Sequence, residues 1–139
     1  MTSQYQSPAA ALATHPVYTT LNAFPIVCFS LTLLTDLAFW QTSNLLWLHF
    51  SEWLLVAGLV FGVFVLLARA GDYLVRGMRH PWPAVLGGVA VLILAAINSL
   101  FHTADGRTAV VPFGLALSVA TVLAMIITAW LGRPGVRHV

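Results

Sequence analysis

The chain has 139 residues, of which 60% are apolar and only 7% are charged, so it suits one domain but is too apolar for a water-soluble one. Its six basic residues are arginines with no basic run among them, so the sequence lacks the positively charged surface that binds nucleic acid. The single cysteine, Cys28, excludes an intrachain disulfide. This composition predicts an integral membrane protein whose first partner is the lipid bilayer.

Four apolar runs dominate the sequence, and we expect each of them to cross the membrane as one helix. They cover residues 18–40, 45–68, 82–102 and 109–131. Each reaches the ~20 residues that a helix needs to span a hydrocarbon core of about 30 Å. Because short loops make consecutive helices antiparallel neighbours, the predicted fold is all-α, a transmembrane up-down four-helix bundle over residues 17–132. Polar tails are expected at residues 1–16 and 133–139.

In the first run, one helical stripe collects the polar and small side chains. It consists of Asn22, Pro25, Phe29, Thr32 and Asp36, which step by three or four residues. Side chains at this spacing share one face of a helix and allow close approach of a neighbour in lipid. We interpret the stripe as a packing seam, with Asp36 about one turn from the end of the run.

The second run carries a seam of small residues on one face and a pair of polar residues on the opposite face. Gly58 and Gly62 form a GxxxG seam, the pattern that lets helices pack closely in a membrane. At about 100° per residue, His49 projects about 180° from Gly58, and Glu52 about 60° from His49. One face should meet the bundle and the other a second protomer or another subunit, and the sequence leaves both assignments open. Trp53 is expected to pack between helices.

The connection after the second run indicates how the chain is oriented across the membrane. Residues "RAGDYLVRGMRHPWP" form the longest predicted loop, in which Asp72 is expected to cap or end the second helix. Arginines gather on this side of the membrane, and only Arg107 lies on the other. Because cytoplasmic loops are enriched in basic residues, both termini are predicted to be cytoplasmic.

The last two runs show stripes of the same kind. The third run has Gly87, Val91, Ala95, Asn98 and His102 on one face. The fourth run has Gly114, Ser118, Thr121, Met125, Thr128 and Gly132. We interpret these stripes as packing seams rather than as the lining of a channel.

Antiparallel topology brings five polar residues to one depth near the outer surface: Asp36, His49, Glu52, Asn98 and His102. Ionisable groups inside a span are uncommon and suggest function. Imidazole and carboxylate are common metal ligands, so His49, Glu52, Asp36 and His102 are candidate metal ligands. His49 and His102 are also candidate axial ligands of a haem. The alternatives are a proton relay and a structural role, in which Glu52 bonds His49 or a backbone carbonyl group. His15 and His80 form a further candidate ligand pair on the opposite side.

Several segments resemble a known family when they are taken in order. They are "HPVYTTLNAFPI", "LLTDLAFW", "WLLVAGLVFG", "GDYL", "AAIN" and "WLGRPGV". Together they are similar to the bacterial DUF2231-type family of small four-helix predicted inner-membrane proteins, a domain of unknown function. The matching positions are His15, Pro16, Phe24, Pro25, Asp36, Gly58, Asp72 and Asn98. The resemblance implies a four-helix architecture and a bacterial inner membrane, and it implies no reaction. His49 and Glu52 lie outside its pattern.

The sequence therefore favours a non-enzymatic structural or accessory subunit of a membrane assembly, which pairs with a copy of itself or another subunit through a seam such as Gly58/Gly62. No nucleophile elbow, phosphate loop, CxxC pair or HExxH motif is present. The first alternative is a haem- or metal-binding redox module that uses the outer polar cluster. The second alternative is proton-coupled transport.

Overall fold

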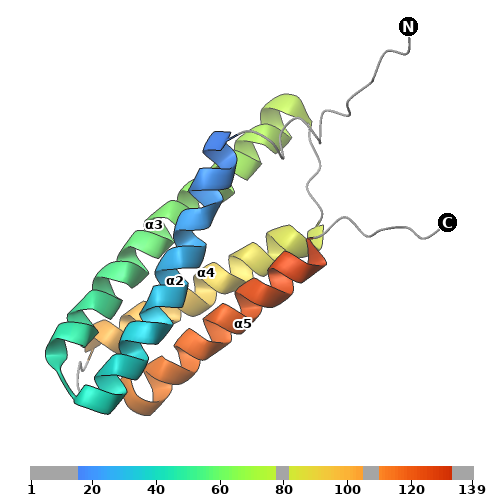
Figure 1. Cartoon of the computed structure of the whole chain (residues 1–139). Helices are drawn as coiled ribbons and strands as arrows, with labels where there is room; N and C mark the ends of the chain where they lie inside the picture. The colour runs from blue at the N-terminus through green and yellow to red at the C-terminus, as the bar shows by residue number, and fades with distance from the viewer. Residues whose placement is uncertain (1–15, 78–81, 105–109, 133–139) are drawn as a thin grey trace, which may run out of the picture.

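The computed structural model describes residues 16–77, 82–104 and 110–132, and these residues are almost entirely helical. The long helices are α2 (Pro16–Thr42), α3 (Leu45–Arg76), α4 (Trp82–Ala104) and α5 (Leu115–Leu131). A short kinked segment, η1 (Val110–Gly114), precedes α5, and its Val111 has an extended backbone. Figure 1 shows α2 and α4 running in one direction and α3 and α5 in the other. The described part of the chain contains no strand, which confirms the predicted all-α fold.

Four segments of the described chain are long and apolar enough to cross a bilayer. They are Thr19–Thr42, Leu45–Val75, Trp82–Thr103 and Val110–Leu131. The chain is therefore a multi-pass membrane protein. The predicted tails at residues 1–16 and 133–139 fall, apart from Pro16, outside the described residues.

A two-residue turn joins α2 to α3 and makes them antiparallel neighbours. Ser43 adopts a positive φ of 52°, and its backbone N–H donates to the Phe39 carbonyl over 2.7 Å. Asn44 then caps α3, since its side-chain oxygen accepts from the backbone N–H of Leu46 at 3.0 Å. Capping on both sides of the turn leaves few backbone groups without a partner at this end of the bundle.

Helix α3 is longer than predicted, and the assignment of Asp72 to its end is wrong. The helix continues through Asp72 to Arg76 and stops at Gly77, whose φ of 63° lies in the left-handed region that glycine tolerates. The Gly77 N–H closes the helix on the carbonyls of Asp72 and Tyr73. The residues from 69 to 76 include polar side chains and Gly71 but no proline, so the helix can continue through them and polarity alone was a poor marker of its end.

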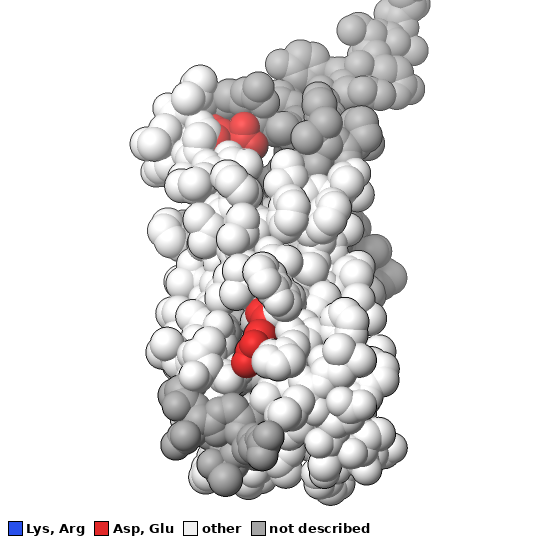
Figure 2. Space-filling model, turned by 90° about the vertical axis from the view of Figure 1, so that its left-hand side faces the viewer, with Lys and Arg blue, Asp and Glu red and all other residues white. Residues whose placement is uncertain are grey.

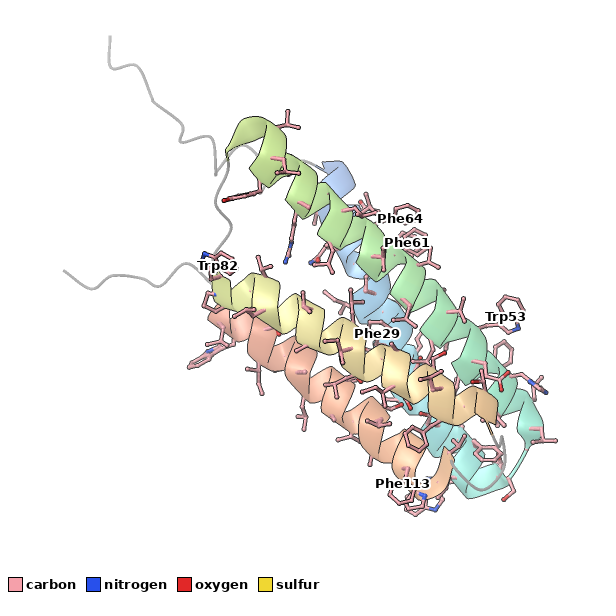
Figure 3. All side chains as sticks on the ribbon, turned by 180° about the vertical axis from the view of Figure 1, so that it is seen from behind. Phe29, Trp53, Phe61, Phe64, Trp82 and Phe113 are labelled. Carbon is pink, nitrogen blue, oxygen red and sulfur yellow. The ribbon has the colours of Figure 1, made fainter. Side chains whose placement is uncertain are left out.

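The predicted stripes lie inside the bundle. On α2, Pro25, Phe29, Thr32 and Asp36 are all buried, and α4 and α5 bury the part of their stripes that lies in the half of the bundle with the α2–α3 turn. The prediction for Trp53 is wrong, because 74% of this residue is exposed and Figure 3 shows it on the outside of α3. In a bilayer the outside is as apolar as the inside, so tryptophan needs no protein neighbour there.

The GxxxG face of α3 points into the bundle. A Cβ atom built on Gly58 would lie 2.5 Å from Cε1 of Phe29 on α2, closer than van der Waals contact allows. A Cβ on Gly62 would collide with the end of Leu92 on α4. The absence of side chains at these two positions therefore lets α2 and α4 approach α3 within one chain.

Two apolar clusters lie at different heights in the bundle and leave a polar layer between them. The first, near the middle, consists of Phe29, Leu55, Val91 and Ala95. The second, near the α2–α3 turn, consists of Phe39, Leu48 and Val110. On α2, Asp36 lies in the sequence between Phe29 of the first cluster and Phe39 of the second. On α3, Ser51 lies between Leu48 of the second cluster and Leu55 of the first. The two helix pairs α2–α3 and α4–α5 lie close together at this end and separate towards the other (Figures 1 and 3).

Candidate functional site

The polar layer takes one central side chain from each long helix. These are Asp36 of α2, Ser51 of α3, His102 of α4 and Ser118 of α5, and none of them is more than 1% exposed. Each belongs to the stripe of small and polar residues that its helix turns inward. The helical repeat of the sequence thus carries four hydrogen-bonding groups to one place inside a membrane-spanning bundle.

Asp36 is the centre of this layer, because each of the other three side chains bonds its carboxyl group. Ser51 Oγ donates to Oδ1 over 2.5 Å, and Ser118 Oγ donates to Oδ2 over 2.5 Å. The third partner, His102, has its Nε2 2.9 Å from Oδ1. A buried carboxyl group needs this kind of saturation, since burial without partners costs several kcal/mol or more. A single residue therefore links all four helices.

The second nitrogen of His102 fixes how many protons the histidine–aspartate pair holds. Nδ1 lies 2.9 Å from the backbone carbonyl oxygen of Asn98. A carbonyl can only accept, so Nδ1 must carry a hydrogen. The contact from Nε2 to Asp36 then contains one proton, on the imidazole or on the carboxyl group. In both arrangements the Asp36–His102 pair has no net charge, which suits an apolar surrounding.

A second group of side chains supports the hydroxyls of the layer. The Asn98 Nδ2 donates to Ser118 Oγ at 2.8 Å, so the Ser118 hydroxyl accepts this bond and donates its own hydrogen to Asp36. On the other side, Thr35 Oγ1 lies 2.7 Å from Ser51 Oγ, a contact in which either hydroxyl can be the donor. Among the described residues, Asn98 Oδ1 is the one buried side-chain nitrogen or oxygen atom without a hydrogen bond.

The layer is closed above and below by apolar side chains. Towards the α2–α3 turn, Phe39, Leu48 and Val110 are 7%, 3% and 0% exposed and cover it. On α5, Gly114 permits a close approach, because a Cβ there would be only 3.2 Å from Cε1 of His102. Because the four central side chains are no more than 1% exposed, each hydrogen bond between them is stronger than it would be in solution.

His49 and Glu52 lie elsewhere, on the outer surface of α3. Nδ1 of His49 is 3.3 Å from Oε2 of Glu52, and their side chains are 65% and 30% exposed. Figure 2 shows acidic atoms at two places on this face, and the lower of the two lies among uncharged residues. The pair thus bonds within one helical turn, as the structural alternative predicted, and the described residues give it no hydrogen bond to the Asp36 layer.

The structure brings together only part of the predicted site. Asp36 and His102 meet, whereas His49 and Glu52 are on the outside of the bundle. In the described segments, no three His, Cys, Asp or Glu side chains are grouped so that they could hold a metal ion. The two histidines do not face a common space, and both nitrogens of His102 are already engaged. The metal and haem assignments remain predictions that this arrangement does not support. His15 and His80 lie outside the described residues.

Sequence reasoning counted Ser118 among packing residues and missed the bonds of Ser51 and Ser118 to Asp36. Ser51 is seven residues before Gly58, and Ser118 is four residues after Gly114, so each shares a helix face with a packing glycine. That shared face was the available signal. A serine on an inward face of a membrane helix is a natural donor to any carboxylate at the same depth.

Comparison with known proteins adds a family and nothing more specific. The chain matches, over residues 14–138, the family model described as "Predicted membrane protein (DUF2231)". No curated protein and no solved structure matches it. Since the match covers most of the sequence, the chain belongs to the DUF2231 family of predicted membrane proteins.

Proposed function

We propose that the protein is a non-enzymatic structural or accessory subunit of an assembly in a bacterial inner membrane. The observation that carries this proposal is the closed polar layer around Asp36. Its bonds run within the chain, apolar residues cover it, and no central member is more than 1% exposed. Catalysis or transport requires that a substrate or ion reach the polar groups, whereas a structural layer works best when closed.

The proposed orientation has both termini in the cytoplasm. The start of α2, the end of α3 and the end of α5 lie at the same end of the bundle in Figure 1. Arg69 and Arg76 belong to the last turns of α3, so this end also carries the arginines of the described chain. The positive-inside rule then assigns this end to the cytoplasm.

Mild extraction of native membranes followed by native electrophoresis tests whether the protein is a subunit. The chain has a mass of 15.0 kDa, and an accessory subunit should migrate in a much larger complex of constant composition. A detergent-corrected mass of one free chain would overturn the proposal. The polar layer need not be altered for this measurement, so the result does not depend on a variant that folds poorly.

Proton-coupled transport is a second candidate, and the proton held by the Asp36–His102 pair is the observation that favours it. Vesicles that contain the purified protein and an internal pH-sensitive dye separate the two functions. A structural subunit should give the same proton flux as empty vesicles under an imposed pH difference. A flux that Asp36→Asn reduces to the empty-vesicle level would establish transport instead.

A further inference from the structure

The outer surface of α3 carries a regular stripe of exposed residues. The stripe steps by four, three, four, three and four residues, and we define it as His49, Trp53, Val56, Val60, Val63 and Leu67. All six are exposed, with relative exposures from 46% to 74% for the five apolar residues. From first to last the stripe covers 18 helical steps, about 27 Å, which is close to the thickness of the hydrocarbon core.

This outer stripe is unusual because ionisable groups belong to it. Glu52 lies beside His49, and one hydrogen bond joins them. Within the described part of the chain, His49 Nε2 and Glu52 Oε1 have no partner. On α2, α4 and α5, in contrast, no described side chain that is exposed is ionisable. Ionisable residues within spans almost always face protein or a water-filled space. We therefore expect this surface of α3 to contact protein, whereas the apolar surfaces of the other helices can face lipid.

We propose that the outer stripe is the contact surface for a second copy of the same chain. The two α3 helices would run side by side in the same direction, about a two-fold axis along the membrane normal. A two-fold interface must be self-complementary, and His49 with Glu52 meets this condition, since it offers a donor and an acceptor one helical turn apart. Each Glu52 would bond the partner's His49, over an axial offset of about 4.5 Å.

The spacing of the stripe suits this arrangement. Alternating steps of three and four residues repeat every 3.5 residues on average, which is the seam of two helices that cross at about 20°. Val56, Val60 and Val63 are small enough for the helices to approach, and dispersion contacts are the main attraction between apolar helices in lipid. The inference goes beyond the proposed function, because an accessory subunit could act as a single chain.

Cysteine cross-linking in proteoliposomes at low protein density tests the position of the interface. In a Cys28→Ala chain, which has no other thiol, single cysteines replace Val56 or Val60, and Ile126 on α5 is the control site. All three residues are exposed, at 46%, 48% and 60%. Mild oxidation should give at least five-fold more covalent dimer at residues 56 and 60 than at residue 126. Equal yields at all three sites, or no dimer at residues 56 and 60, would overturn the proposal.

The role of the polar pair is tested by energy transfer between labelled chains as they are diluted with lipid. We expect His49→Leu to raise the dissociation constant of the dimer at least ten-fold, because it leaves Glu52 without a donor in both chains. Leu123→Ala, at an exposed site of α5, should leave it unchanged. Since both positions are on the surface, thermal unfolding should be the same for both variants. An unchanged dissociation constant in a folded His49→Leu protein would refute the role of the pair.

Discussion

Replacing His102 with leucine should destabilise the bundle more than any other single change in the polar layer. Asp36 would keep its two bonds from serine hydroxyls but lose the partner that makes the pair neutral. Removing one member of a buried pair of ionisable groups costs about 3–5 kcal/mol, because the other member stays buried without its partner. The backbone carbonyl that His102 Nδ1 contacts still belongs to the helical ladder of α4, so no second penalty is added.

A companion variant separates the loss of the pair from the loss of packing. In Asp36→Leu combined with His102→Leu, no ionisable group remains in the layer. The hydroxyls of Ser51 and Ser118 can then turn to carbonyl groups one turn earlier, as Thr32 already does in α2. Since replacing a whole buried pair by apolar residues is often close to neutral, the double variant should be more stable than His102→Leu alone.

The assay is thermal unfolding in detergent, followed by circular dichroism, for the wild type, both single variants and the double variant. We expect His102→Leu to unfold on the order of 10 °C below the wild type. The double-variant cycle should give a favourable coupling of at least about 2 kcal/mol between the two side chains. If His102→Leu unfolds within about 2 °C of the wild type, or the two losses simply add, the Asp36–His102 pair does not hold the bundle together.

Two further predictions concern packing and protonation. Gly58→Ala should lower the unfolding free energy by about 1–3 kcal/mol, because its Cβ would meet the buried Phe29 ring at 2.5 Å. Gly71→Ala in the same helix meets nothing within 4 Å and should unfold no earlier than the wild type, so equal losses in the two alanine variants would contradict this account. Asp36→Asn should unfold close to the wild type, because its side-chain amide can donate one N–H to Nε2 of a neutral His102 and the other to Ser51 Oγ, which then accepts instead of donating. A loss as large as that of His102→Leu would show that the layer requires a carboxylate.

Periodicity was sufficient to predict the interior of three helices. The 3.6-residue repeat placed Phe29 and Asp36 on one face of α2, and Asn98 and His102 on one face of α4, and all four are buried. Antiparallel topology also predicted that Asp36 and His102 would reach the same depth, and Nε2 of His102 lies 2.9 Å from Oδ1 of Asp36. These predictions succeeded because polar and small residues are rare in a membrane helix and therefore mark its inner face clearly.

Helix α3 shows where sequence reasoning stops. Its glycine face and its His49–Glu52 face point in opposite directions, and both faces are otherwise apolar. In water the hydrophobic effect would decide which face is buried, but a bilayer is as apolar as a protein interior. The fit of Gly58 against Phe29 and the bond from Ser51 to Asp36 decide the orientation, and both depend on residues far apart in the sequence.

The same lack of a hydrophobic preference explains why the Asp36 layer matters for the fold. In lipid, sliding one helix along its neighbour or rotating it exchanges one apolar surface for another at little cost. A shift of one turn moves a side chain by 5.4 Å, which breaks bonds that now measure 2.5 to 2.9 Å. Because Asp36 bonds one residue from each of the other three helices, a shift of any one of them leaves a carboxyl, imidazole or hydroxyl group without a partner. The layer therefore selects one register and one rotation for all four helices, a specificity that apolar packing in a membrane does not supply.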